Sequence, residues 1–593
     1  MRMPVGHAGN CRQGPLRWVG IVGCGVGPRS IIAVAASLFA VIAVMMAVMG
    51  CPSRVMAGAD GDKSDRRCAE CHAGIYASWE KTTMARGSGW ATDGLIQGSF
   101  FHQRSGVNYR VDSKNGEARL RYERDNPAPG DVLKGEERLV YFIGSGRRGR
   151  TYLFARPVEG GNLWFESPVN WYGGRSRYDM APAYENAERA PLELLVEPNC
   201  LHCHMTGVAQ PLPFARNEWA GAPFRQGGVG CAACHGNTEA HVASRGQKPM
   251  LRLETLTPKR QDSVCLQCHL EGDAMIQLRG RSLVNFEPGQ DLSETAVYFV
   301  NAGSAKSVLR ASSQYEALLR SACRRAAGER MTCTTCHDPH SLPAPEERVT
   351  YFRTRCLQCH TAPAFDAKGH HPEQQDCASC HMPTRNTADI SHEQLTDHNI
   401  EARPGARDST ATQTESTRFT DAVDLVPVGE EEAGDRERGL AYAQFAGRGD
   451  KLSYVRAESL LEKVEFFGQA DALVHEDLGY LAQIGGDRTK AEAEDRATLA
   501  IDPHDVTALT NLAVLLAQVG NVTESEALLK SVAEHNPSQT VSVLTLAALR
   551  CANHDGAGAM EEVRLALRYN PDDAAARRFE QTGEYGGVHC RLR

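Results

Sequence analysis

Cys333-Thr334-Thr335-Cys336-His337 is one of seven copies of Cys-x-x-Cys-His in this chain of 593 residues. With 20 Cys and 21 His, composition alone predicts roughly 0.02 copies of the pattern, so the repetition is not accidental. The pattern is typical of covalent c-type haem attachment, in which the two thiols form thioether bonds and the histidine binds the iron. The seven copies are Cys68/Cys71/His72, Cys200/Cys203/His204, Cys231/Cys234/His235, Cys265/Cys268/His269, Cys333/Cys336/His337, Cys356/Cys359/His360 and Cys377/Cys380/His381.

Zinc sites and disulfides are the alternatives that paired cysteines leave open. Zinc binds Cys-x-x-Cys pairs, and disulfides are common in exported proteins. Neither needs a histidine directly after the second cysteine, yet all seven copies have one. The sequence therefore predicts seven covalently attached haem c groups, with the motif cysteines as attachment points and the motif histidines as proximal ligands of the haem iron.

The first 57 residues are expected to direct export and to take no part in the fold. Four arginines precede an uncharged apolar run over residues 31–49, and Val55-Met56-Ala57 offers a small-residue cleavage site, as in a signal peptide. A retained membrane anchor and a lipoprotein attachment at Cys51 stay open. All three interpretations predict a periplasmic or cell-surface protein, the last two with membrane association through this segment.

The motif density predicts a haem domain over about 60–400. Residues 68–381 hold all seven motifs, about 45 residues for each, so the haems themselves are expected to supply much of the buried apolar area. The expected fold class is therefore mainly α, with little regular structure and short helices carrying the motifs. Alternating patterns around Asn115-Gly116 predict one small β-meander over about 106–168.

The residues after about 400 contain no motif and read differently. Residues 401–430 are polar without an apolar period, which predicts a linker. Beyond it, Pro503, Pro537 and Pro571 recur every 34 residues, and so do Leu478, Leu512 and Leu546. This period is typical of the tetratricopeptide repeat, so 431–585 is predicted to form an α-solenoid. We expect the solenoid to dock a redox partner, and its deletion to leave the haem content intact.

The overall charge of the chain bears on its partners. A formal net charge of −8 argues against a nucleic-acid partner, because nucleic-acid phosphates attract basic surfaces.

The second axial position of each haem iron decides between an electron carrier and a catalyst. Eight histidines outside the motifs lie in the haem domain, enough for seven irons, with only one of the adjacent His370 and His371 expected to bind. Met84 competes for one position, and Met/His ligation would raise the potential of that haem. The expected second ligands are Met84, His102, His202, His241, His340, His370, His392 and His398.

Several strings resemble multihaem cytochromes c of the superfamily of the nitrifiers' tetrahaem cytochrome and octahaem hydroxylamine oxidoreductase. The stretch from Cys68 to Met84 resembles the first haem segment, where the family usually has histidine in place of Met84. Residues 231–241 are similar to a segment whose last histidine is a distal ligand, 331–340 to the paired-haem segment, and 380–398 to the C-terminal ending. The resemblance covers about 65–400 and implies haems stacked at near-contact distance.

These patterns favour electron transfer over catalysis. The predicted protein is an exported heptahaem cytochrome that transfers electrons along stacked haems, to or from a redox partner docked with the help of the repeats. One alternative is a multihaem oxidoreductase acting on a small nitrogen or sulfur compound at a haem with an open axial site. Another is a repeat-based assembly scaffold. No residue is assigned a catalytic role, and the Cys-x-x-Cys-Lys motif usual in related nitrite reductases does not occur in the chain.

Overall fold

The computed structural model describes residues 65–128, 130–182, 184–302, 309–361, 376–387, 390, 394–402, 423–429 and 432–590. The predicted leader (1–57) and most of the predicted linker lie outside these residues. Among the helices described, none is both long and apolar enough to cross a membrane.

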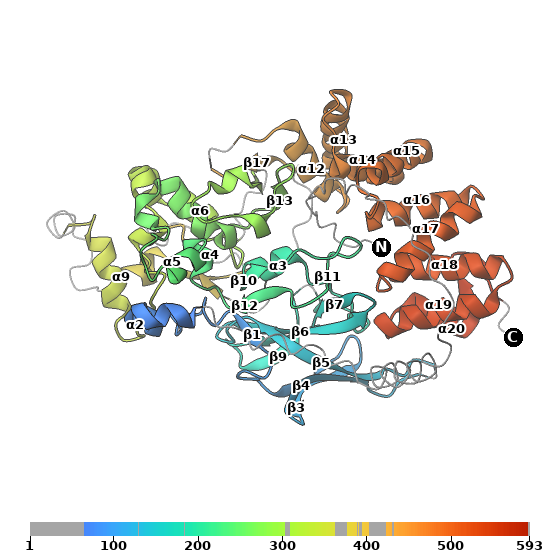
Figure 1. Ribbon diagram of the computed structural model, residues 1–593, viewed down its shortest axis with the longest axis horizontal. Helices are drawn as coiled ribbons and strands as arrows, with labels where there is room; N and C mark the ends of the chain where they lie inside the picture. Colours follow the sequence, from blue (N-terminus) through green and yellow to red (C-terminus); the bar gives the residue numbers. More distant parts are fainter. Residues whose placement is uncertain are drawn as a thin grey trace, which may run out of the picture. The chain divides into compact units, whose positions relative to one another are not determined.

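An antiparallel sheet of ten strands occupies residues 88–219 (Figure 1). Its main path runs through β11 (Glu218–Trp219), β7 (Gly161–Glu166), β6 (Gly149–Val158), β5 (Lys134–Ile143), β4 (Glu117–Arg124), β3 (Val107–Lys114) and β2 (Gly98–His102). Off this path, β1 (Ser88–Trp90) pairs with β5, β8 (Val169–Tyr172) pairs with β6, and β9 (Arg177–Met180) pairs with β8.

The alternating sequence explains the central hairpin of this sheet. Val107, Tyr109 and Val111 are buried on one face of β3, and the two residues between them are exposed. The turn between β3 and β4 is Asn115-Gly116, both with positive φ (55° and 80°), the conformation that tight hairpin turns require. The buried residues of this face pack with those of β4, β6 and β7 in one core.

The prediction of a mainly α fold with a haem-packed start and a small β-meander is wrong. The structure is 42% helical and 19% strand, with the antiparallel sheet in its first half and helices in its second. The additional strands β1, β8, β9 and β11 have two to four residues each, too short for an alternating pattern to show. They form because they pair with strands that lie elsewhere in the sequence.

A second, smaller sheet joins distant parts of the chain. It consists of β13 (Ala274–Gln277), β14 (Ala296–Asn301) and β17 (Leu425–Pro427), paired antiparallel in that order. β17 comes from the predicted linker, so the end of that segment is part of the fold.

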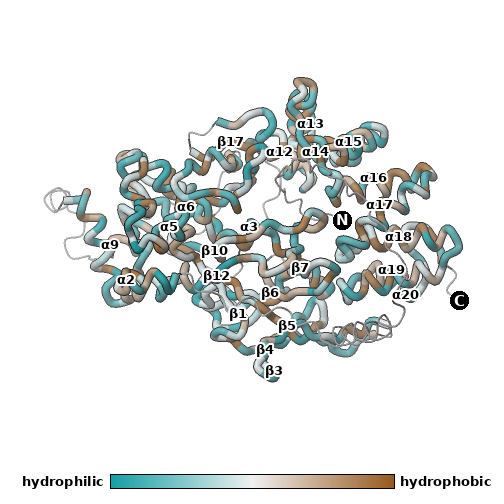
Figure 2. The backbone as a smooth tube through the Cα atoms, viewed as in Figure 1, coloured by the Kyte–Doolittle hydropathy of each residue, from teal (hydrophilic) through white to brown (hydrophobic). Residues whose placement is uncertain are grey.

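The C-terminal region consists of helices that pair in the order of the chain (Figure 1). They are α12 (Asp435–Ala446), α13 (Lys451–Phe466), α14 (Ala472–Gly485), α15 (Arg488–Ile501), α16 (Val506–Gln518), α17 (Val522–His535), α18 (Thr540–Ala552), α19 (Gly556–Tyr569) and α20 (Ala574–Thr582). Figure 2 shows apolar and polar residues alternating along these helices. The periodic Leu478, Leu512 and Leu546 are buried, and Asp471 and Asp505 cap helix N-termini through their side chains.

The first helices of this region share a hydrophobic core with the smaller sheet. Ile276 and Phe299 of β13 and β14 are completely buried in one cluster with Leu440 of α12, Leu461 of α13 and Leu478 of α14. The repeats are therefore a structural part of the haem-motif region and do not form a separate arm.

The last helices are fixed to the large sheet by a buried ion-pair network. The Asp572 carboxylate, with no exposed surface, accepts hydrogen bonds from Arg124 of β4 (Nη2–Oδ2, 2.5 Å) and from the Ala190 amide (2.8 Å). Arg189 also pairs with this carboxylate (3.2 Å). Tyr569, at the end of α19, packs in the core of the sheet.

A third contact lies between these two attachments. The Phe214 ring, from the loop before β11, stacks on His535 at the end of α17 with 3.9 Å between ring centres. It also lies 4.1 Å from the ring of His504, in the connection between α15 and α16. The helical repeats thus contact the first half of the chain near their start, middle and end.

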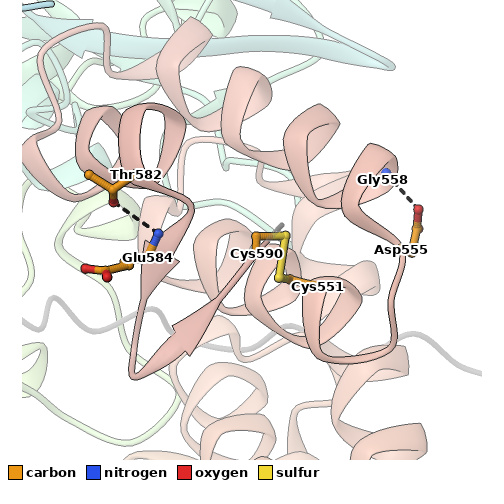
Figure 3. The surroundings of a disulfide bond; sticks show 6 residues. All are labelled: Cys551, Asp555, Gly558, Thr582, Glu584 and Cys590. Atoms are coloured by element: carbon orange, nitrogen blue, oxygen red, sulfur yellow. Dashed lines mark hydrogen bonds between the residues drawn. A yellow bond between two sulfur atoms is a disulfide. The ribbon is translucent and has the colours of Figure 1, made fainter. Parts of the chain in front are cut away.

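A disulfide joins Cys551 at the end of α18 to Cys590, beside the terminal hairpin of β18 (Glu584–Tyr585) and β19 (Val588–His589) (Figure 3). The bond closes 39 residues of sequence. Both cysteines are buried in the core of the last repeats, so the bond ties the C-terminus to α18.

Replacing Cys590 with serine is expected to lower the free energy of unfolding by about 2–4 kcal/mol, since the unfolded chain gains the freedom that the cross-link removes. Chemical denaturation under non-reducing conditions measures the change. As a control, the double replacement Cys551→Ser/Cys590→Ser should be no less stable than Cys590→Ser. Equal stability of Cys590→Ser and the parent chain would contradict a formed disulfide.

Candidate haem-binding site

Short helical segments carry all the motifs. They are α2 (Arg66–Trp79), α3 (Pro198–His202), α4 (Ala232–His235), α6 (Pro258–His269), the 3₁₀ turn η5 (Cys333–Thr335), α9 (Arg348–Leu357) and α11 (Cys377–His381). Local signals begin several of these: Pro198 and Pro258 occupy first helical positions, and the Thr257 and Asp376 side chains cap α6 and α11.

The cysteines of these segments fit covalent haem attachment. All fourteen are free thiols, although the same chain forms the Cys551–Cys590 disulfide. Burial raises the pKa of the Cys234 thiol to about 12 and that of Cys356 to about 11, which indicates apolar neighbours around both. The helices α2, α4, α9 and α11 contain no buried residue of their own, so their side chains remain accessible to a large apolar group.

Four of the predicted attachment cysteines lack the buried surroundings that a haem-packed domain predicts. Cys71, Cys200 and Cys359 are exposed, and Cys380 is half-buried with the Ser379 hydroxyl 3.9 Å from its sulfur. The physical reason is local, because the helices that carry or precede three of these cysteines (α2, α9 and α11) bury none of their own residues. The assignment of Cys71, Cys359 and Cys380 to haem attachment therefore rests on motif spacing, and their burial adds nothing to it.

Three motif histidines face a second histidine from another part of the chain. The ring centres of His72 and His241 are 6.3 Å apart, with 21° between the ring planes. His235 and His340 are 5.9 Å apart at 10°, and His337 and His398 are 6.1 Å apart at 29°. An iron bound from both sides, with metal–nitrogen bonds of about 2 Å and each nitrogen about 1 Å from its ring centre, requires roughly 6 Å. The three pairs therefore fit an iron between two imidazoles.

Backbone carbonyls orient several of these rings. Nδ1 of His235 hydrogen-bonds the Leu251 carbonyl (2.8 Å), that of His241 the Lys248 carbonyl (2.8 Å), and that of His398 the Thr396 carbonyl (3.0 Å). A carbonyl can only accept, so Nδ1 carries the proton and Nε2 keeps its lone pair for a metal.

Burial also keeps key rings neutral, as metal binding requires. It lowers the pKa of His337 to about 4, and it lowers the pKa of His204, His269 and His398. The neighbouring His398 adds to the effect on His337, because two imidazolium charges in contact repel each other.

Motifs that are distant in the sequence lie next to each other. The Cys68 and Cys231 sulfurs lie within 4.8 Å of one another and of an Asp65 oxygen, which links the first motif to the third. Interacting thiols likewise join Cys203 to Cys268 and Cys265 to Cys333. The Cys356 and Cys377 thiols interact as well. Every motif thus touches at least one other through these pairs.

The other predicted ligands have different surroundings. His102 lies on β2 with both ring nitrogens hydrogen-bonded, to Ser105 (2.8 Å) and the Glu185 carbonyl (3.2 Å), and is not brought to a motif. His202 is largely buried, and its Nε2 has no hydrogen-bond partner among the described residues. Met84 lies in the turn before β1, close to the backbone of the second motif through Gly87. His370 and His392 lie outside the described residues.

The partners of four motif histidines are not identified. Within the described part of the chain, no imidazole stacks on His204, His269, His360 or His381. The His381 Nδ1 contacts the Glu401 carbonyl (2.5 Å), so its ring is oriented as those of the paired histidines are. The sequence alone named His241, His340 and His398 as candidates but did not show which motif each one faces.

Comparison with known families supports this interpretation of the motifs. Residues 175–236 match the family described as cytochrome c554 and c-prime, and residues 326–365 match the doubled CXXCH motif. These are segments of multihaem cytochromes c. The first match spans the second and third motifs, and the second spans the fifth and sixth. Together they support covalently bound haem c with iron in this multihaem cytochrome.

The solved structures similar to this multihaem cytochrome match 25% of its chain each. MamA of AMB-1 is 27% identical over 81% of its own length, with a TM-score of 0.22. YrrB, described as a TPR protein with an unusual peptide-binding site, is 17% identical over 77% of its length, with a TM-score of 0.21. A tetratricopeptide repeat protein from Parabacteroides merdae is 18% identical over 57% of its length, with a TM-score of 0.23. No curated protein matches the chain. At these TM-scores we draw no argument from the likeness, and the repeats rest on their own helix pairing.

Proposed function

We propose that this chain is an exported heptahaem cytochrome c that passes electrons to or from a protein redox partner. The three imidazole pairs at about 6 Å are the observation that carries the proposal. Bound haem c supplies an iron that alternates between the ferric and ferrous states. An iron with two protein ligands has no free position for a substrate, which favours electron transfer over catalysis.

The roles of the residues follow from their placement. The fourteen motif cysteines attach the cofactors, and the motif histidines are the proximal ligands. His241, His340 and His398 are the distal ligands at the first, third and fifth motifs. The carbonyls of Leu251, Lys248 and Thr396 hold three of these imidazoles in the metal-binding tautomer. The contacts between motifs keep the attachment sites side by side, as electron exchange between them requires.

Export and partner docking are parts of the same proposal. The leader pattern in residues 1–57 and the Cys551–Cys590 disulfide both support an oxidising compartment outside the cytoplasmic membrane, periplasmic or at the cell surface. Four exposed apolar side chains on or directly after α13 support contact of the repeats with a protein: Leu452, Val455, Phe466 and Phe467.

Haem counting and ligand binding test the proposal. The purified protein should contain seven haems, measured from iron and from the pyridine haemochrome, and show low-spin signals in electron paramagnetic resonance. The reduced protein should bind no carbon monoxide. A haem count below seven would refute the heptahaem assignment. A native high-spin haem that binds carbon monoxide or nitrite would instead favour the oxidoreductase alternative.

Replacing His398 with alanine is expected to convert one low-spin haem into a high-spin haem, because it removes one of the two ligands at His337. The reduced variant should then bind one carbon monoxide per chain, where the parent binds none, as measured by the shift of its Soret band. His554→Ala, which changes a histidine in the helical repeats, is the matched control and should leave the spectrum unchanged. An unchanged His398→Ala spectrum would remove His398 from the ligand set.

A further inference from the structure

Three metal-binding side chains meet within the first helices of the repeats, away from every Cys-x-x-Cys-His motif. They are Glu465 at the end of α13, His475 in the first turn of α14 and Glu494 in the middle of α15. One ligand atom from each lies within 4.8 Å of the other two. The Nδ1 atom of His475 is 2.7 Å from Oε2 of Glu494, and both side chains are mostly buried.

The repeat pattern makes these residues unusual. One period later, the positions of Glu465, His475 and Glu494 are occupied by Leu499, Leu509 and Leu528. In the next unit Leu509 is buried, as expected for a contact between paired helices. The first unit thus has a histidine and two carboxylates where the second has three leucines. Burying such groups costs free energy unless they are paired or coordinate a metal.

The surroundings leave the two carboxylates poorly compensated. Among the described residues, no lysine or arginine forms an ion pair with Glu465 or Glu494, and His475 is the sole basic partner of Glu494. The nearby Lys490 pairs instead with Glu458 and Glu462. In the third unit the residue equivalent to Glu494 is Glu562, and it pairs with Arg550 (3.2 Å). The same position is therefore neutralised by arginine in one repeat and lacks such a partner in the other.

We propose that Glu465, His475 and Glu494 bind a divalent transition-metal ion, with zinc as the best fit. One imidazole and two carboxylates are a ligand set that zinc accepts, and three protein ligands leave one position for water. Tetrahedral ligands at about 2 Å from the ion lie roughly 3.3 Å apart, so small side-chain rotations bring the three groups into place. The ion would join α13, α14 and α15 near the start of the repeats, next to the core that they share with the smaller sheet.

This inference does not depend on the proposed electron transfer, and its test uses the haem-loaded full chain. The protein is incubated with zinc chloride and dialysed, and zinc and iron are then measured together by elemental analysis. We expect one zinc per chain in the parent and at least a tenfold weaker affinity in His475→Gln and Glu494→Gln, with iron unchanged. Glu562→Gln is the matched control and should retain the zinc.

Two results would overturn the site. One is that the parent protein binds no more zinc than Glu494→Gln. The other is that Glu562→Gln loses zinc to the same extent as His475→Gln. A second readout guards against misfolded variants: zinc should raise the thermal midpoint of the helical far-UV signal in the parent and in Glu562→Gln, and leave it unchanged in His475→Gln. Equal stabilisation of all three proteins would also refute the proposal.

Discussion

Asp572→Ala is expected to lower the free energy of unfolding by about 3–5 kcal/mol, because the change leaves Arg124 buried without its partner. The Arg124 side chain is 7% exposed and the Asp572 side chain 0% exposed, so water cannot replace the lost carboxylate. The Ala190 amide loses its acceptor in the same step. Denaturant unfolding followed by circular dichroism measures the difference.

The control for this prediction is Glu188→Ala. Glu188 also pairs with an arginine, Arg104, but its side chain is 78% exposed, and exposed ion pairs contribute about 0–1 kcal/mol. If Asp572→Ala proves no more destabilising than Glu188→Ala, the network around Asp572 does not fix the last repeats to the sheet.

A chain that ends at residue 430 is expected to lose its folded haem-motif region as well as its repeats. The truncation exposes Ile276 and Phe299, which are buried against α12 and α14, and each such side chain contributes about 1.5–3 kcal/mol when buried. It also removes the partners of Arg124 and Phe214. This expectation reverses the sequence-based one, which treated residues 431–585 as a separable docking arm.

Haem content per chain and resistance to limited proteolysis measure the outcome of the truncation. A chain ending at residue 590, which keeps every described contact, is the control and should match the parent in both. A soluble, protease-resistant chain of 430 residues with full haem content would show that the shared core is dispensable.

Local sequence predicted the features that depend on neighbouring residues. The motif helices, the Asn115-Gly116 turn and the 34-residue helix period all follow from short-range signals. The size of the large sheet does not, because β1, β8, β9 and β11 have too few residues to show a pattern. Their pairing is decided by strands elsewhere in the chain.

The candidate site shows the same division. The motifs and the set of possible second ligands were readable, since each involves only the identity and spacing of residues. The matching of His72 with His241, or of His337 with His398, was not, because it depends on how separate segments pack. His102 illustrates the limit: its residue type suited a ligand, but two hydrogen bonds within the structure occupy its ring.

The contact between Arg124 and Asp572 joins residues 448 positions apart. A ribosome therefore completes almost the entire chain before the first half can receive its last buried partner. Until then the guanidinium of Arg124 has to stay hydrated, and the core around Phe299 has no helices to cover it. Contacts of such long range slow folding, because the chain entropy is lost before the contact is gained. A prematurely terminated chain thus retains the full set of motif cysteines without the residues that close the structure around them, and is an early substrate for proteases.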